Sequence, residues 1–165
     1  MPAAEFWIAA LLLVTSHSTP AVAGGLMGRR WAWPIDAGVM LRDGRPLFGA
    51  SKTWRGLALA LSASTLATSL LLERPGLGLA FAALAMTGDL ASSFVKRRRG
   101  LPPHADALFI DQLPECLLPL VVLRGALPLS WTDLLLLVVL FVPANLIANR
   151  SWEWVLTHRR RASPR

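Results

Sequence analysis

The residues best suited to chemistry lie between positions 87 and 115, in the segment TGDLASSFVKRRRGLPPHADALFIDQLPE. Asp89 interrupts an apolar run there, and Ser92, Ser93 and Lys96 follow it. On a helix these residues recur at i, i+3, i+4 and i+7, so they share one face. At a rise of ~1.5 Å per residue, Lys96 lies about 10 Å along the axis from Asp89. The pattern predicts a helix that carries a site for a metal ion and a polyanion at its membrane end.

Other candidate groups occur in the polar segments that flank the apolar runs. An unpaired Asp within a membrane span costs about 2.5–3.5 kcal/mol, so Asp89 needs a partner or a metal ion. Carboxylates flanked by Lys and Arg suit Mg²⁺ bound to substrate phosphates, and two of them, here Asp89 and Asp111, suffice. The full candidate set, expected to converge on one membrane face, consists of Asp36, Lys52, Thr53, Arg55, Asp89, Ser93, Lys96, Arg97, Asp111 and Glu115.

The composition places these groups in a single membrane-embedded domain that covers residues 1–165. Hydrophobic residues make up 54% of the chain, and the mean hydropathy of +0.49 is high for a soluble globular protein. The net charge of +7 resembles that of nucleic-acid-binding proteins. However, the cations lie in short segments between apolar runs, which is typical of orientation signals at membrane edges and argues against nucleic acid. The single cysteine, Cys116, excludes an internal disulfide and a cysteine-based zinc site.

Five apolar runs predict a bundle of about five transmembrane helices, at Glu5–Gly25, Trp54–Leu72, Leu77–Val95, Leu113–Leu129 and Trp131–Asn149. A cleaved signal peptide is the alternative for the first run, but its start carries an acid and lacks Lys or Arg. The fourth run is short for a ~30 Å membrane core, so Arg124 must snorkel or the helix must tilt. The tail predicts an interfacial segment with a disordered basic end from about residue 158.

Charge predicts the orientation of this bundle. With five alternating spans, 15 of the 17 Lys and Arg residues lie on one side of the membrane, and only Arg74 and Arg124 lie on the other. The positive-inside rule then puts the amino terminus outside and the carboxyl terminus in the cytoplasm. Four or six spans would divide the cations between the two sides. In the first run, Ser16, His17 and Ser18 are expected to face a cavity or other helices rather than lipid.

Three segments, at 43–56 (DGRPLFGASKTWRG), 88–100 (GDLASSFVKRRRG) and 111–115 (DQLPE), resemble the CDP-archaeol synthase family. This family is a branch of the CDP-diacylglycerol synthase (phosphatidate cytidylyltransferase) superfamily. The segment 34–38, PIDAG, is similar to the family's PIDGG, and 93–97, SFVKR, fits the superfamily's S-x-[apolar]-K-R. The resemblance implies a five-helix enzyme of the cell (inner) membrane with its active site on the cytoplasmic side. Such an enzyme makes a CDP-lipid and pyrophosphate from CTP and a lipid phosphate, with Mg²⁺.

The resemblance also implies roles for individual residues. Asp89 and Asp111 match the family's metal-binding acids, and the basic positions near the nucleotide phosphates match Lys52, Arg55, Lys96 and Arg97. The family's DQLD reads DQLP here, with Glu115 one position later, and residues 102–110 lack the glycine-rich loop of relatives nearer to phosphatidate cytidylyltransferases. The expected roles are then catalytic for Asp89, Asp111 and Lys96, substrate-binding for Lys52, Thr53, Arg55, Ser93 and Arg97, and metal-binding for Asp89, Asp111 and Glu115.

Each candidate also has a structural interpretation. Asp89 can be an interior acid paired with a hydroxyl or an Arg, Asp111 can cap the fourth helix, and Asp36 can be a turn acid. Lys52 and Arg55 can be orientation charges only. For the whole chain, the alternatives are a small transporter or lipid-binding protein that uses Asp89 as an ion site, and an inactive relative that serves as a partner subunit. The acceptor lipid and the oligomeric state stay open.

Overall fold

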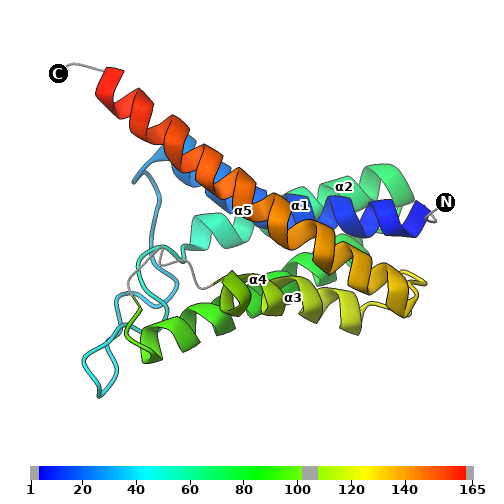
Figure 1. Cartoon of the computed structure of the whole chain (residues 1–165), viewed down its shortest axis with the longest axis horizontal. Helices are drawn as coiled ribbons and strands as arrows, with labels where there is room; N and C mark the ends of the chain where they lie inside the picture. Colours follow the sequence, from blue (N-terminus) through cyan, green and yellow to red (C-terminus); the bar gives the residue numbers. More distant parts are fainter. Residues whose placement is uncertain (1–3, 102–107, 163–165) are drawn as a thin grey trace.

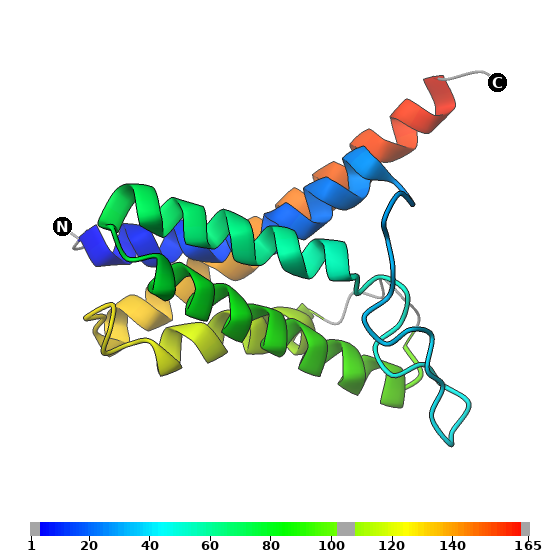
Figure 2. The same cartoon turned by 180° about the vertical axis from the view of Figure 1, so that it is seen from behind.

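In the computed structural model of the protein, residues 4–101 and 108–162 are described, apart from the side chains of residues 108–111, 149–150 and 152–162. This part of the chain forms five helices: α1 (Ala4–Met27), α2 (Trp54–Leu72), α3 (Pro75–Arg98), α4 (Leu108–Val122) and α5 (Trp131–Ala162). Successive helices run back and forth, and α5 crosses the others obliquely (Figures 1 and 2). The predicted all-α architecture is confirmed.

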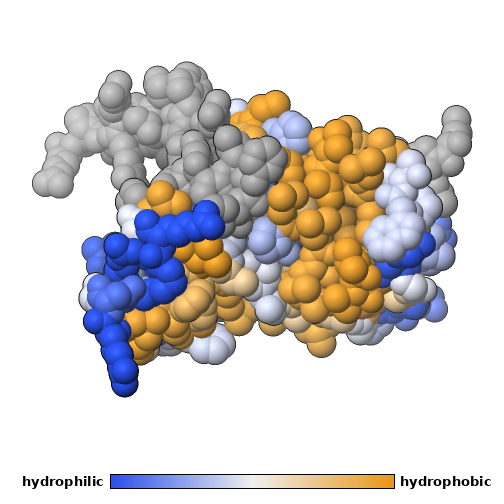
Figure 3. Space-filling view, turned by 60° about the horizontal axis from the view of Figure 1, so that its bottom comes forward, coloured by the Kyte–Doolittle hydropathy of each residue, from blue (hydrophilic) through white to orange (hydrophobic). Residues whose placement is uncertain are grey.

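Four of the five helices, all but α4, are long and apolar enough to cross a membrane. Figure 3 shows a broad apolar band on the face in view, with hydrophilic side chains at its two ends. Helix α4 has 15 residues, so at ~1.5 Å per residue it is shorter than a ~30 Å hydrocarbon core. The protein is therefore a multi-helix membrane protein in which α4 fills the bundle without the length of a full span.

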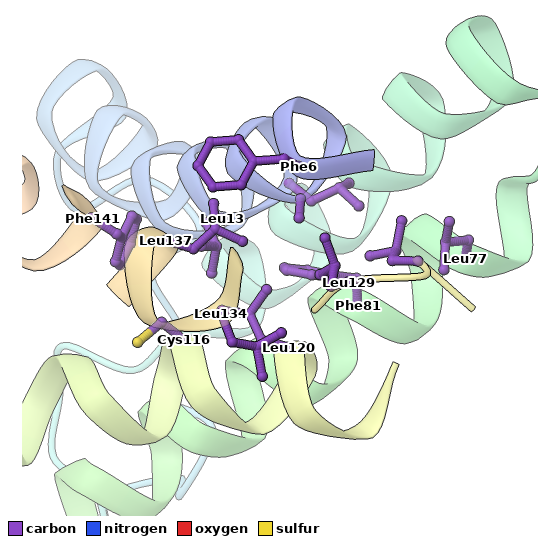
Figure 4. Packing of buried hydrophobic residues seen from close by; sticks show 13 residues of the cluster. Phe6, Leu13, Leu77, Phe81, Cys116, Leu120, Leu129, Leu134, Leu137 and Phe141 are labelled. Atoms are coloured by element: carbon purple, nitrogen blue, oxygen red, sulfur yellow. The ribbon is translucent and has the colours of Figure 1, made fainter. Parts of the chain in front are cut away.

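The bundle is held by an apolar cluster that draws side chains from α1, α3, α4 and α5 (Figure 4). Phe6 and Leu12 of α1 and Phe81 of α3 are buried in it, beside Leu120 of α4 and Leu137 of α5. Small residues allow the closest helix contacts, as is common in membrane bundles. A Cβ added at Gly78 of α3 would lie 2.1 Å from a backbone oxygen of α2, so only glycine fits there.

The ends of α2 lie where the sequence predicts them. Thr53 is the N-cap, and its hydroxyl accepts a hydrogen bond of 3.1 Å from the backbone N–H of Gly56. At the other end Glu73 adopts a left-handed conformation, and Pro75 begins α3. A tight turn at Glu73 and Arg74 therefore joins α2 to α3.

The predicted bounds of the last two helices are wrong. Helix α4 begins at Leu108 and ends at Val122, instead of spanning Leu113–Leu129. It ends before Gly125 and Pro128, and Arg124 Nε donates a hydrogen bond of 2.8 Å to the carbonyl of residue 129. Helix α5 continues beyond the predicted end at Asn149, through part of the predicted disordered tail, to Ala162. Residues 144–162 contain no glycine or proline, so no helix breaker stops it.

The long connection between α1 and α2 is tied to the carboxyl end of α3. Arg98 forms an ion pair with Asp43, and Arg45 donates hydrogen bonds to the carbonyls of Arg97 and Arg98. Cations at the end of a helix also interact favourably with its exposed carbonyls. Figure 2 shows this connection lying across the end of the bundle where α1 and α3 finish. The polar segments predicted to converge therefore lie at the same end.

Candidate active site

Two acid–base pairs lie near this end of the bundle. The ammonium Nζ of Lys52 is 2.6 Å from each carboxylate oxygen of Asp89. Nδ1 of His17 is 2.8 Å from Oε1 of Glu115. The two acids follow Gly88 and Pro114, the residues at which α3 and α4 are in closest contact, and the four side chains are here named the acid–base cluster. Its members come from α1, the connection before α2, α3 and α4.

Close packing of α3 against α4 brings the two acids into this cluster. A Cβ added at Gly88 would lie 2.3 Å from the carbonyl oxygen of Pro114 and 2.8 Å from Cα of Glu115. The residues that follow this contact on each helix are Asp89 and Glu115. The Glu115 side chain is 4% exposed, while those of Lys52 and Asp89 are each 22% exposed. Buried carboxylates are stable only when they are paired, which both pairs achieve.

The predicted polar face of α3 lies inside the bundle. Ser92 and Ser93 are buried, and Lys96 is only 8% exposed although it is a cation near the end of the helix. The hydroxyl of Ser92 donates a hydrogen bond of 2.8 Å to the backbone carbonyl of Asp89. Arg97 is also buried, and a Cβ added at Gly49 would lie 3.8 Å from its Cδ. Ser92, Ser93 and Lys96 thus share a buried face of α3, as predicted, whereas the roles of these residues and of Arg97 in binding and catalysis stay predictions.

Two of the predicted substrate-binding residues have local structural partners. The Thr53 hydroxyl caps α2, and Arg55 Nη1 donates hydrogen bonds to the carbonyls of Gly28 and Arg30. Arg55 therefore joins the first turn of α2 to the segment after α1. Both contacts fix the backbone on either side of Lys52, which lies immediately before Thr53.

Asp36 orders the connection that presents Lys52. Its carboxylate accepts hydrogen bonds from the backbone N–H groups of Gly38, Phe48 and Gly49, at 3.0, 2.9 and 2.8 Å. The neighbouring N–H of Ile35 donates a hydrogen bond of 2.8 Å to the carbonyl of Lys52. Burial acts to raise the pKa of Asp36, but the three N–H groups outweigh it and hold the pKa below its ordinary value. In this structure Asp36 acts as a turn acid.

These hydrogen bonds to Asp36 make the stability of the protein depend on pH. The pKa of Asp36 is lower in the folded protein than in the unfolded chain. Its ionised carboxylate therefore contributes fully to the free energy of unfolding above the ordinary carboxyl pKa, and this contribution is lost as the pH falls through the pKa of the folded protein. Asp36→Asn should lower the free energy of unfolding at neutral pH by roughly 1–3 kcal/mol. It should also weaken the loss of stability on acidification. Thermal unfolding of the wild type and of Asp36→Asn, from neutral pH down to about pH 3, measures this loss of stability. An equal loss in the two proteins would contradict the prediction.

Asp111 lies within α4, one helical turn before Glu115. It is therefore inside the helix and not its N-cap, and its side chain lies outside the described part of the chain. Among the described side chains, no group of three or more His, Cys, Asp or Glu residues has a metal-binding arrangement. The described carboxylates of the predicted metal set, those of Asp89 and Glu115, are the two acids of the acid–base cluster.

His17 is the member of the cluster that residue spacing did not identify as a site residue. No ligand spacing relates it to the other histidines, and it lies 98 positions from Glu115 in the chain. The available signal was its place in the polar triplet Ser16-His17-Ser18 within an apolar run. That triplet was expected to face other helices. Ser16 confirms this, since it is buried and its hydroxyl is 3.0 Å from that of Ser64 in α2.

Comparisons with known proteins agree with this architecture. Residues 67–152 match a family described as CarS-like CDP-archaeol synthase. A CDP-archaeol synthase of Aeropyrum pernix is 40% identical over 134 residues, which cover 78% of this chain and 73% of the relative. That of Sulfurisphaera tokodaii is 31% identical over 90% of this chain and 92% of the relative. That of Pyrococcus furiosus is 41% identical, and the match covers 59% of this chain and 60% of the relative.

A solved structure extends the likeness to three dimensions. The protein in it is described as an intramembrane enzyme for archaeal membrane lipids biosynthesis. It is 34% identical to this chain, with a TM-score of 0.69 over 86% of this chain and 90% of that one. The range matched by the family, residues 67–152, includes Asp89 and Glu115. The chain therefore belongs to the CDP-archaeol synthase family, whose members are membrane cytidylyltransferases that use CTP and a lipid phosphate.

Proposed function

We propose that this chain transfers a cytidylyl group from CTP to a membrane lipid phosphate, with Mg²⁺, at the acid–base cluster. The observation that carries the proposal is that Lys52 pairs with the half-buried Asp89 of α3, while the buried Glu115 of α4 lies at the contact between these two helices. An oxygen of the lipid phosphate attacks the α-phosphorus of CTP, the bond from that phosphorus to the β-phosphate oxygen breaks, and pyrophosphate leaves. The attacking oxygen is already anionic, so positioning and charge neutralisation suffice.

The donor chemistry of the cluster fits Mg²⁺. This ion favours oxygen ligands and typically takes one or two carboxylates together with substrate phosphates. Asp89 and Glu115 supply carboxylates from two helices in direct contact, and we assign Asp111 as the third acid because it lies one turn from Glu115. When bound, the ion would neutralise negative charge on the triphosphate.

Lys52 is assigned to the phosphates of CTP. Its ammonium lies 2.6 Å from the carboxylate of Asp89, which places a cation beside the proposed metal site. Lys96 and Arg97, buried at the end of the same face, are proposed to act on the phosphates as well, with Ser93 beside them. Thr53 and Arg55 are assigned a supporting contribution through the backbone on either side of Lys52.

Lys52→Ala should mainly raise the concentration of CTP needed for half-maximal turnover. A charge-assisted hydrogen bond contributes about 1.5–3 kcal/mol, so the apparent KM for CTP should rise roughly 10- to 100-fold. Arg42→Ala is the matched control, because Arg42 is an exposed cation of the same connection. Steady-state kinetics over a CTP range measures both variants. An unchanged CTP dependence in Lys52→Ala would remove this residue from the phosphate site.

A groove next to the cluster suits a hydrocarbon chain of the lipid acceptor. It has a volume of about 380 Å³ and lies between α3 and α4, where Thr87, Gly88 and Ala91 face Pro114, Leu117 and Leu118. Gly88 and Pro114 line the groove and form the contact between α3 and α4, so a hydrocarbon chain in the groove would lie along the two helices that carry Asp89 and Glu115. Apolar side chains that face lipid accept phytanyl, acyl and polyprenyl chains alike.

The proposed orientation places this site on the cytoplasmic face of the cell membrane. Arg74 and Arg124, the two cations predicted on the opposite side, belong to neighbouring turns, since Arg74 Nη1 lies 3.4 Å from the carbonyl oxygen of Ala126. The positive-inside rule then favours a cytoplasmic location for the basic end, where CTP is available. Labelling of single cysteines introduced at each end, in a Cys116→Ser background, tests this side.

The activity is tested with purified protein, labelled CTP, Mg²⁺ and a panel of lipid phosphates. The panel includes archaetidyl-type, diacyl and polyprenyl phosphates, and the product is separated as a CDP-lipid. Formation of a CDP-lipid that requires both the acceptor and the divalent ion is expected. Failure to form one from any acceptor, by protein that remains folded in lipid, would contradict the proposed function.

A further inference from the structure

We infer that His17 is a positioning residue that holds the Glu115 carboxylate in place for the metal ion beside Asp89. The inference rests on the proposed function, because it assigns a task to a residue next to the proposed metal site. His17 lies on α1, a helix that supplies none of the groups predicted from sequence motifs. It would make α1 a part of the site rather than only a part of the bundle.

The geometry of α4 explains why Glu115 needs such a partner. The carbonyl of Pro114 faces Gly88 across the α3–α4 contact. The next residue is turned by about 100° around the helix axis, because α-helices have 3.6 residues per turn. Cα of Glu115 also lies against Gly88, so the position of the Glu115 carboxylate relative to Asp89 depends on its side-chain conformation and on the group that holds it. That group is His17, at 2.8 Å.

The imidazole of His17 is itself held in position. Its ring meets the ring of Phe141 on α5 edge to face, with centroids 5.8 Å apart and planes at 88°. On the same helix, Ser16 contacts Ser64 of α2, which fixes the rotation of α1. The ring is therefore restrained from two directions, and Nδ1 is the nitrogen that meets the carboxylate. Partners that orient metal-binding carboxylates in this way typically change metal affinity 10- to 100-fold when removed, as an order of magnitude.

The test compares His17→Ala, which removes the hydrogen bond, with His17→Asn, whose amide nitrogen lies close to the position of Nδ1. Mn²⁺ is the probe, and its binding to each protein in lipid nanodiscs without nucleotide is measured by electron paramagnetic resonance. His17→Ala should weaken Mn²⁺ binding roughly 10- to 100-fold, and His17→Asn should recover most of the loss. Thr19→Ala is the control, because its hydroxyl bonds only within α1, to the carbonyl of Thr15.

A second measurement separates positioning from general packing. The Mg²⁺ concentration for half-maximal turnover should rise in His17→Ala more than kcat falls, while thermal stability of the two His17 variants should be similar. Equal Mn²⁺ affinity in wild type and His17→Ala would overturn the inference about His17 but not the proposed metal site. Equal losses in His17→Ala and His17→Asn would overturn it as well. Absence of Mn²⁺ binding by the wild-type protein would instead overturn the proposed metal site, and this inference with it.

Discussion

Asp89→Asn is expected to reduce Mg²⁺-dependent CTP turnover by at least about a thousandfold. The metal ion is proposed to contribute several kcal/mol of charge stabilisation in the transition state, and each ~1.4 kcal/mol corresponds to a factor of ten in rate. The asparagine amide keeps one oxygen that can accept a hydrogen bond from Lys52. The contact between α3 and the connection from α1 to α2 is therefore preserved. The substitution therefore removes the charge of the carboxylate and its affinity for metal, and it leaves the bundle in place.

The matched control for this substitution is Asp43→Asn. Asp43 also pairs with a cation, Arg98, but on the exposed connection and outside the acid–base cluster. An exposed ion pair contributes little to stability, and Asp43 has no proposed role at the site, so turnover should stay near that of the wild type. Membrane insertion and helix content, followed by extraction and circular dichroism, should be unchanged in both. Wild-type turnover in Asp89→Asn would refute the site assignment.

Asp111→Asn extends the same experiment to α4. If Asp111 joins Asp89 at the ion, as proposed, its loss should abolish Mg²⁺-dependent turnover to a similar extent. Weaker Mn²⁺ binding should accompany the loss of activity, because the change removes a ligand and not a substrate contact. Normal turnover in Asp111→Asn would leave Asp89 and Glu115 as the acids of the site.

Local signals in the sequence were sufficient to predict α2 at both ends. A capping hydroxyl at Thr53 and a proline at Pro75 are features that act within a few residues of where they occur. The face of α3 that carries Asp89, Ser93 and Lys96 was predictable for a similar reason, since a 3.6-residue period fixes which side chains point the same way. Such signals cannot say which helix lies opposite a given face.

The spacing of residues in the sequence could therefore not predict the two pairs of the acid–base cluster. Lys52 lies 37 positions from Asp89, and His17 lies 98 positions from Glu115. Both contacts depend on how four separate segments pack. The residue pattern and the family resemblance both gave Lys52 and Asp89 as candidates, but neither gave a site role for His17. Local roles were also ambiguous, because Thr53 and Arg55 are residue types that suit a phosphate as well as a helix cap or a carbonyl.

Gly88→Ala should disable the site through packing alone. The added Cβ would lie 2.3 and 2.6 Å from the carbonyl oxygen and carbon of Pro114, so α4 must move by about 1 Å to reach ordinary van der Waals separation. Overpacking of this kind typically costs about 1–3 kcal/mol of stability. A displacement of about 1 Å also separates Glu115 from Asp89, and misplacement of that size can reduce turnover about 100-fold.

Substitutions at two other glycines of α3 distinguish a loss of site geometry from a loss of stability. Gly76→Ala adds a methyl group with no neighbour within 4 Å, so it should be neutral or slightly stabilising, because alanine favours helix. Gly78→Ala forces α3 away from α2, with a Cβ 2.1 Å from the carbonyl oxygen of Ser64, but about 16 Å along the helix axis from Asp89. Gly78→Ala should therefore lower the melting temperature as Gly88→Ala does, yet keep Mn²⁺ affinity near that of the wild type. If both variants lose Mn²⁺ binding in proportion to stability, the contact between Gly88 and Pro114 has no particular role in placing the acids.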